Sequence, residues 1–273
     1  MTDRYAVIGH PIAHSQSPLI HCLFAEATGQ SLAYTAIEAP LAGFAETVRA
    51  FRDGGGLGMN VTLPFKLQAF EIATGPMERA RMAGAANALK FEGGRIWAEN
   101  FDGVGLARDI KHNLGVALAG KRVLICGAGG ATRGAILPLA ACGAAMIAVA
   151  NRTADTAHRL KQDFAAHVSL QTCGYEALAG EVFDVVINAT STGLSGAGLP
   201  LPAGVFAPGA LAYEMVYGKG LTPFLKQAQA AGVAHIADGV GMLVEQAAEA
   251  FAWWRGVRPE TRSVIQRLTV PLV

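Results

Sequence analysis

A glycine turn in the middle of the chain limits the possible folds more than any other segment. Residues 121–126 (Lys-Arg-Val-Leu-Ile-Cys) form a short apolar run typical of a buried parallel strand, and residues 127–131 (Gly-Ala-Gly-Gly-Ala) follow at once. Residues 132–141 then have the pattern of a helix, and residues 144–150 that of a second apolar strand. This order predicts a βαβ unit whose turn binds a nucleotide pyrophosphate at the start of the helix.

Two departures from the usual dinucleotide fingerprint bear on this prediction. Thr132 stands where the fingerprint has Gly or Ala, which leaves a purely structural turn as an alternative. The second strand ends in Asn151-Arg152-Thr153, without the acid that usually holds the ribose 2′-hydroxyl of NAD. Arg152 can pair with a 2′-phosphate that a carboxylate would repel. The sequence therefore predicts NADP over NAD, and the alternative is that Arg152 is a solvated surface residue.

Alternating helices and strands extend on both sides of this unit. Patterns of helices at residues 154–164 and 225–231 and of strands at 183–188 and 211–215 predict a doubly wound sheet over residues 105–240. The N-terminal part shows a second α/β pattern, and the apolar spacing of residues 241–254 predicts a helix that closes back on it. We therefore predict two α/β domains, one formed by residues 1–104 and 241–273 and the other by residues 105–240.

The composition excludes several classes of protein. The chain has 273 residues, of which 52% are hydrophobic and 16% charged, so it is not intrinsically disordered. A net charge of +1 leaves no electrostatic footprint for nucleic acid or an anionic membrane. Residues 1–9 lack the apolar length of a signal peptide, and Pro138 and Gly143 interrupt the uncharged stretch 134–150. The cysteines form no C-x-x-C pair, and we expect no metal site.

Further candidate residues lie at strand ends of the N-terminal domain. Ser15 and Ser17 come just before a predicted helix, where they suit an anionic group such as a carboxylate, although one of them can simply cap the helix. Asn60, Thr62 and Lys66 lie at a strand-to-helix junction, and Asn87 and Asp102 follow in the segments 84–88 and 99–105. Lone lysines and aspartates are usually solvated surface charges, so position alone does not assign them a role.

Taken together, these segments resemble the shikimate dehydrogenase family, which interconverts 3-dehydroshikimate and shikimate with NADP. The distinctive motifs are Ser-x-Ser-Pro at residues 15–18, Asn-Val-Thr-x-Pro-Phe-Lys at 60–66 and Asp-Gly-x-Gly at 102–105. The other matching stretches are residues 9–14, 83–87, 100–101, 127–134, 151–153, 188–190 and 239–246, and all of them run in the order of the family over nearly the whole chain.

The resemblance implies a role for each matched residue. Lys66 and Asp102 would be the catalytic pair. The substrate would be bound by Ser15, Ser17, Asn60, Thr62, Asn87, Tyr217 and Gln246. NADP would be bound by Gly127, Ala128, Gly129, Gly130, Ala131, Asn151, Arg152, Thr153, Thr190, Met215, Gly239 and Glu78.

The resemblance also implies an architecture and a cellular setting. It implies an N-terminal substrate domain completed by C-terminal helices, a Rossmann-type NADP domain and a cleft between the two. It further implies a cytoplasmic enzyme of aromatic amino-acid and chorismate biosynthesis that acts on a small molecule as a monomer or homodimer.

One departure and two alternatives stay open. Phe101 stands where the family usually has Thr, which removes a hydroxyl beside Asp102 and adds bulk. Within the enzyme class, the alternative is a quinate/shikimate dehydrogenase that uses both NAD and NADP, although Ser15, Ser17 and Arg152 favour shikimate and NADP. The other alternative is a metabolite sensor without turnover, which would be expected to have lost Lys66 or Asp102.

Overall fold

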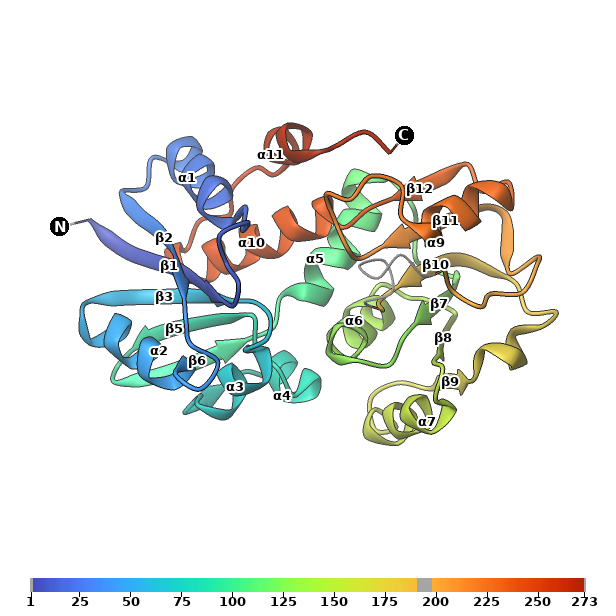
Figure 1. Ribbon diagram of the computed structural model, residues 1–273, viewed down its shortest axis with the longest axis horizontal. Helices are drawn as coiled ribbons and strands as arrows, with labels where there is room; N and C mark the ends of the chain where they lie inside the picture. The colour runs from blue at the N-terminus through green and yellow to red at the C-terminus, as the bar shows by residue number, and fades with distance from the viewer. Residues whose placement is uncertain (1, 191–197, 273) are drawn as a thin grey trace. The chain divides into compact units, whose positions relative to one another are not determined.

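The computed structural model describes residues 2–190 and 198–272 and divides into two compact units. Unit 1 comprises Met1–Gly105 and Val244–Gln266, and unit 2 comprises Leu106–Leu243 and Arg267–Val273. Each unit contains a six-stranded sheet flanked by helices (Figure 1), which confirms the predicted fold class of two α/β domains. The chain end 267–273 groups with unit 2, whereas the sequence led us to place residues 241–273 in one domain.

The sheet of unit 1 is mixed. Its strands β1 (Asp3–Gly9), β2 (Leu32–Glu38) and β3 (Gly56–Val61) are parallel, because β1 pairs with both of its neighbours in that sense. Strand β5 (Ala88–Glu92) runs antiparallel to β3 and to β6 (Arg95–Glu99). The short strand β4 (Gly75–Pro76) completes the order β2-β1-β3-β5-β6-β4. As a result, β3 and β6 end, and β5 begins, at the same edge of the sheet.

Helices cover both faces of this sheet because successive side chains of a strand point to opposite sides. Ala6 and Ile8 of β1 pack in a buried cluster with Phe44 of α2 (Phe44–Asp53). Tyr5, on the other face, stacks on Trp254 of α10 (Val240–Arg255) with 4.9 Å between ring centroids. The remaining helices that lie wholly or mainly in unit 1 are α1 (Ser17–Thr28), α3 (Lys66–Glu71), α4 (Glu78–Ala83) and α11 (Arg262–Leu268).

The sheet of unit 2 is parallel throughout and has the order β12-β11-β10-β7-β8-β9. Numbered from β7, this is the strand order 6-5-4-1-2-3 of a dinucleotide-binding domain, whose ligand lies where the order reverses, outside the carboxyl ends of the strands. The strands are β7 (Arg122–Cys126), β8 (Met146–Ala150), β9 (Leu170–Cys173), β10 (Phe183–Asn188), β11 (Phe206–Glu214) and β12 (His235–Ala237).

The helices of unit 2 connect these strands. They are α6 (Gly130–Ala141), α7 (Ala154–Asp163) and α9 (Pro223–Ala230), while α5 (Asp102–Arg108) begins in unit 1 and continues into a π-helical turn at Asp109–Asn113. The uncharged stretch 134–150 is divided between α6 and β8. In the two described ranges of the chain, no helix is both long and apolar enough to cross a membrane.

Candidate active site

In unit 1 a lysine and an aspartate from two different strand-to-helix junctions form an ion pair. Lys66 is the first residue of α3, which follows β3, and Asp102 is the first residue of α5, which follows β6. Lys66 Nζ lies 2.7 Å from Asp102 Oδ2, and the side chains are 30% and 11% exposed. The pair is therefore largely buried yet reachable by a small molecule. An ammonium group in such a place can donate a hydrogen bond and a proton to a bound oxygen.

Asn87 fixes the other oxygen of the carboxylate. Its Nδ2 donates to Asp102 Oδ1 over 2.8 Å and to Gln246 Oε1 over 3.0 Å, and its Oδ1 accepts from the backbone N–H of Phe101 over 2.9 Å. Because the residue is only 2% exposed, these bonds account for both amide hydrogens in a buried place. Each oxygen of Asp102 thus has its own donor, Lys66 or Asn87, and the carboxylate has a defined orientation.

Asn100 secures the start of α5, although the sequence analysis assigned it no role of its own. Its Oδ1 accepts from the backbone N–H of Asp102 over 3.1 Å, and its Nδ2 donates to the carbonyl of Ala85 over 3.1 Å. An asparagine side chain often accepts a hydrogen bond from the backbone N–H two residues further on, and this stabilises a turn. The spacing of Asn100 and Asp102 was therefore the signal in the sequence for this role. The preceding residue Glu99 binds Arg79 over 2.7 Å, and burial raises the pKa of the Glu99 carboxyl.

Phe101 adds its bulk to the interior of unit 1. Its ring is 3% exposed and packs in a cluster with Ala88 and Ala250. The ring also meets Trp253 edge to face, with 5.8 Å between centroids, and the Arg79 guanidinium lies 5.3 Å from its centroid. The aromatic side chain that replaces the usual Thr therefore has apolar partners of its own.

The predicted substrate residues of unit 1 lie at the same edge of the sheet. Asn60 is 5% exposed, and its Nδ2 donates to the carbonyl of Asn87 over 3.3 Å, which links it to the network around Asp102. Ser15 Oγ accepts from the backbone N–H of Ser17 over 3.3 Å, so Ser15 does take part in the turn before α1. Thr62 follows β3, and its methyl group lies against Gly9, where a Cβ would come within 2.6 Å.

In unit 2 the glycine turn has the geometry that the motif predicts. Gly127 has φ of 104°, and a Cβ there would lie 2.9 Å from Thr190 Cγ2, so only glycine fits. Thr132 fits where Gly or Ala is usual because its hydroxyl donates to the carbonyl of Gly127 over 2.7 Å. Among the described residues, nothing lies within 4 Å of a Cβ on Gly129 or Gly130, and no side chain caps the start of α6. The turn thus leaves room for a pyrophosphate beside a helix N-terminus.

The end of β8 suits a phosphate group. Arg152 is exposed, and no carboxylate among residues 2–190 and 198–272 forms an ion pair with it. Asn151 Nδ2 donates to the carbonyl of Thr153 over 3.0 Å, which shapes the loop around the arginine. A guanidinium with no acid beside it fits the 2′-phosphate of NADP better than the 2′-hydroxyl of NAD.

A buried carboxylate that sequence analysis missed supports the predicted cofactor residue Thr190. Asn188 Oδ1 accepts from the Thr190 hydroxyl over 2.7 Å and from its N–H over 3.0 Å. Asn188 Nδ2 in turn donates to Glu214 Oε2 over 2.9 Å, and Thr222 donates to the same oxygen over 2.9 Å. Glu214 is fully buried, which raises the pKa of its carboxyl. The signal in the sequence was that Glu214 is an acidic residue at the end of the otherwise apolar strand β11.

The other predicted residues are divided between the units. Met215 and Gly239 lie together in unit 2, because a Cβ on Gly239 would come within 2.3 Å of the Met215 carbonyl oxygen. Tyr217 also belongs to unit 2, and burial raises the pKa of its hydroxyl. Glu78 is exposed at the start of α4 in unit 1. The roles of Tyr217 toward the substrate and of Glu78 toward the cofactor stay predictions.

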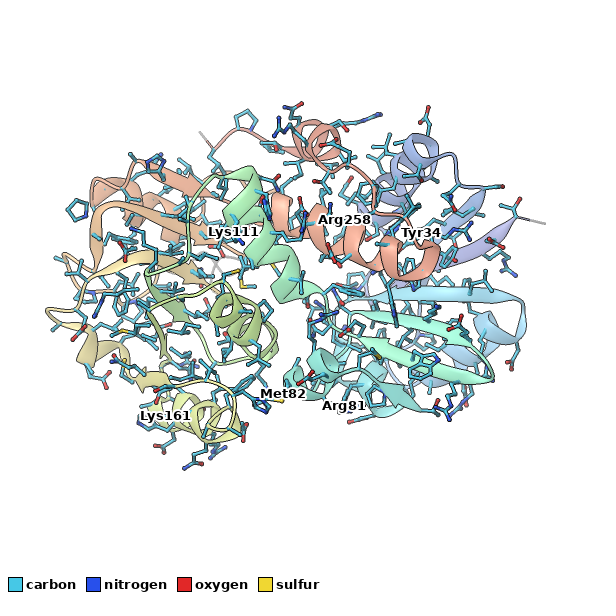
Figure 2. All side chains as sticks on the ribbon, turned by 180° about the vertical axis from the view of Figure 1, so that it is seen from behind. Tyr34, Arg81, Met82, Lys111, Lys161 and Arg258 are labelled. Atoms are coloured by element: carbon cyan, nitrogen blue, oxygen red, sulfur yellow. The ribbon has the colours of Figure 1, made fainter. Side chains whose placement is uncertain are left out.

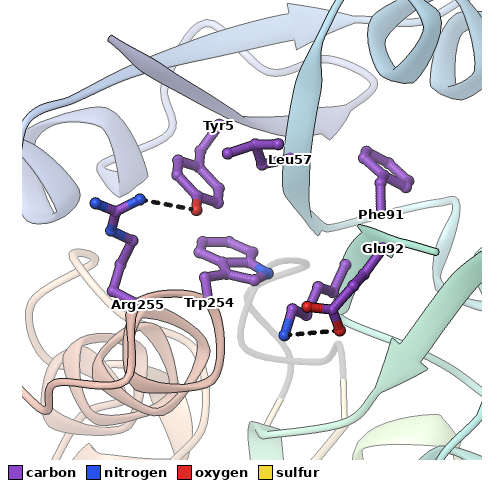
Figure 3. Close-up of a pocket in the computed structure, with 7 residues that line it drawn as sticks. Tyr5, Leu57, Phe91, Glu92, Trp254 and Arg255 are labelled. Atoms are coloured by element: carbon purple, nitrogen blue, oxygen red, sulfur yellow. Dashed lines mark hydrogen bonds and ion pairs between the residues drawn. The ribbon is translucent and has the colours of Figure 1, made fainter. Parts of the chain in front are cut away.

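Unit 1 has a pocket, drawn in Figure 3, whose lining does not include Lys66. It has a volume of about 180 Å³ and is lined by the stacked rings of Tyr5 and Trp254 together with charged side chains. Lys90 Nζ is 3.1 Å from Glu92 Oε2, and Arg255 binds Asp3. Because both cations are already paired, the pocket offers no unpaired charge to an anion. Within the described residues, no cluster of three or more His, Cys, Asp or Glu could hold a metal ion.

Comparisons with known proteins identify the family of the chain. Three family models match the chain: the shikimate dehydrogenase substrate binding domain at residues 7–89, shikimate / quinate 5-dehydrogenase at 106–195 and the shikimate 5′-dehydrogenase C-terminal domain at 239–269. Shikimate dehydrogenase (NADP(+)) of Nitrosospira multiformis is 55% identical over 98% of both chains.

Solved structures are similar over nearly the full length. The crystal structure of an enzyme from Pseudomonas putida is 58% identical, has a TM-score of 0.95 and covers 100% of each chain. Shikimate 5-dehydrogenase from Thermus thermophilus, crystallised with NADP(H) and shikimate, is 31% identical with a TM-score of 0.86 and covers 98% of this chain and 100% of that one.

The buried Glu214 should make stability depend on pH. Its folded-state pKa lies above the ordinary value of 4.5, so between the two values the native state binds more protons than the unfolded state. Ionisation therefore destabilises the native state as the pH rises through this window. We expect the free energy of unfolding of the wild type to fall relative to that of Glu214→Gln as the pH rises above 4.5, because glutamine has no proton to lose. Urea denaturation across this range measures the difference, and a pH-independent difference would contradict the assignment.

Proposed function

Since the chain belongs to the shikimate dehydrogenase family, we propose that it reduces 3-dehydroshikimate to shikimate reversibly with NADPH, a step of chorismate and aromatic amino-acid biosynthesis. The observation that carries the catalytic part of the proposal is the bond between Lys66 Nζ and Asp102 Oδ2 in a place that solvent still reaches. An oxidoreductase of this kind needs a group that moves one proton at the reacting oxygen, and the pair supplies it.

Lys66 is the acid in the direction of reduction. Its ammonium group donates a hydrogen bond to the ketone oxygen of the substrate and offsets the negative charge that develops there. The proton then passes from Nζ to that oxygen, which becomes the shikimate hydroxyl. In the direction of oxidation the neutral amine of Lys66 accepts the same proton, so one residue serves both directions.

Asp102 positions this lysine. Its Oδ2 holds Nζ, while the bond from Asn87 to Oδ1 prevents the carboxylate from turning away. The carboxylate can also accept a hydrogen bond from a neighbouring substrate hydroxyl, and Asn87 and Gln246 add polar groups to the same network. Together these residues define where the ring of the substrate and its reacting oxygen lie.

The residues of unit 2 fit NADP. The turn at residues 127–131 and the start of α6 would hold the pyrophosphate, and Arg152 with Asn151 and Thr153 would hold the 2′-phosphate. Thr190, Met215 and Gly239 would line the nicotinamide end. When bound, NADPH supplies the hydride that adds to the ketone carbon.

The substrate end distinguishes shikimate from the alternatives. Two serines, Ser15 and Ser17, at the start of α1 suit the carboxylate of shikimate, and the absence of an acid from the sequence at residues 151–153 favours NADP. These features support shikimate and NADP over quinate with mixed cofactor use. The intact Lys66–Asp102 pair supports an enzyme over a metabolite sensor. The cytoplasmic location and the monomeric or homodimeric state belong to the same proposal and come from the family resemblance.

Lys66→Ala tests the proton transfer. We expect kcat to fall by about 10²–10⁴-fold, the usual contribution of a positioned acid–base group, with KM for shikimate little changed. Lys90→Ala is the matched control, because Lys90 also belongs to an ion pair of unit 1 but lines the pocket whose lining does not include Lys66. The assay follows reduced cofactor by absorbance with shikimate and NADP⁺. A Lys66→Ala protein that keeps most of its kcat would overturn the role.

Arg152→Ala tests the cofactor preference. Loss of a charge-assisted hydrogen bond should raise KM for NADP⁺ about ten- to a hundredfold and leave KM for NAD⁺ unchanged. Arg122→Ala is the control, because Arg122 pairs with Glu181 at the opposite end of β7 from the glycine turn. An unchanged preference for NADP⁺ in Arg152→Ala would refute the role of the arginine.

A further inference from the structure

The hydroxyl of Tyr34 contacts two of the predicted substrate residues. Tyr34 lies on β2, the edge strand of the unit 1 sheet, and is labelled in Figure 2. Its hydroxyl donates to Asn60 Oδ1 over 2.7 Å. The Ser17 side chain also interacts with this hydroxyl and opposes the rise in the pKa of Tyr34 that burial causes. Neither the family resemblance nor the motifs gave Tyr34 a role.

A buried histidine holds the ring of Tyr34 in place. The ring of His21, on α1, lies parallel to that of Tyr34 with 4.1 Å between centroids and an angle of 5°. His21 is fully buried among Phe24, Phe251 and Trp254, and burial lowers the pKa of its imidazole to about 3. The imidazole is therefore neutral at any working pH and acts as a flat, uncharged support for the tyrosine ring.

From Tyr34 hydrogen bonds lead through Asn60 to the backbone of Asn87, and the side chain of Asn87 bonds to the catalytic pair. The amide of Asn60 receives the tyrosine hydroxyl at Oδ1 and donates from Nδ2 to the carbonyl of Asn87. The side chain of Asn87 donates to Asp102, which holds Lys66. The Asn87 carbonyl can only accept and therefore sets Nδ2 toward it, while the tyrosine hydroxyl holds Oδ1 at the other end of the amide.

We propose that Tyr34 is a positioning residue of the substrate site. Its hydroxyl holds Oδ1 of the Asn60 amide while Nδ2 bonds to Asn87, and so keeps this amide in one position at the end of β3 where a polyhydroxylated acid is proposed to bind. Without the hydroxyl the Asn60 amide loses the shorter of its two hydrogen bonds, 2.7 Å against 3.3 Å, and its position is less well defined. The inference rests on the proposed function, since it concerns the substrate of that same site.

Tyr34→Phe removes the hydroxyl and keeps the ring that stacks on His21. Loss of one oriented hydrogen bond is expected to weaken shikimate binding about five- to tenfold, while KM for NADP⁺ and kcat at saturation stay within about twofold. Tyr5→Phe is the matched control: Tyr5 is a buried tyrosine on the neighbouring strand β1, and its hydroxyl meets Arg255 at 3.4 Å outside this network. Titration calorimetry with shikimate measures the dissociation constants, and steady-state kinetics measures KM and kcat.

A double variant shows whether Tyr34 acts through Asn60. In an Asn60→Ala background, adding Tyr34→Phe should change the dissociation constant of shikimate by less than about twofold, because the amide that the hydroxyl orients is gone. An unchanged dissociation constant in Tyr34→Phe overturns the proposal. The proposal is also overturned if Tyr34→Phe weakens shikimate binding as much in the Asn60→Ala background as in the wild type. The same holds if Tyr34→Phe weakens the binding of shikimate and of NADP⁺ equally. If the wild type binds shikimate and Tyr34→Phe binds it equally well, only this inference fails. If the wild type does not bind shikimate, the proposed function fails as well.

Discussion

The two oxygens of Asp102 accept hydrogen bonds from different donors, and the position of the candidate catalytic lysine in unit 1 depends on both bonds. Lys66 takes one oxygen and Asn87 the other, so the lysine is held by a carboxylate that cannot rotate. Asn87 is itself fixed by Gln246 and by the backbone of Phe101. Four chain segments therefore have to meet at one edge of the sheet before the ammonium group has a defined position. The antiparallel strand β5 makes this possible, because it begins at the edge where β3 and β6 end.

Unit 2 uses the same principle with different groups. There the buried carboxylate of Glu214 holds Asn188, and Asn188 holds Thr190, whose methyl group lies against the tight glycine turn. In each unit a side chain expected to meet a ligand is fixed by an asparagine amide and a carboxylate. Burial raises the pKa of Glu214, so this support destabilises the native state when the carboxyl ionises. Such an arrangement is understandable where the position of a functional group matters more than stability.

Local signals predicted much of the fold. The strand at 183–188 has the bounds that its apolar run indicates, and the βαβ unit around the glycine turn is present. The hairpin of β5 and β6 was missed, although Gly93-Gly94, with φ of 60° and 74°, is a typical turn for one. Most of the site contacts could not be read locally. Tyr34 and Asn60 are 26 positions apart, and Asn87 and Gln246 are 159 apart, so only the folded sheet brings them together.

The central claim is that Lys66 and Asp102 work as one proton-transferring unit. The most direct measurement compares kcat for shikimate oxidation in Lys66→Ala, Asp102→Asn and the double variant. If Asp102 acts by holding the lysine, removing it adds little once the lysine is gone, and the double variant should be no more than about twofold slower than the slower single variant. Losses that multiply in the double variant would show that the two residues act independently and would contradict the account.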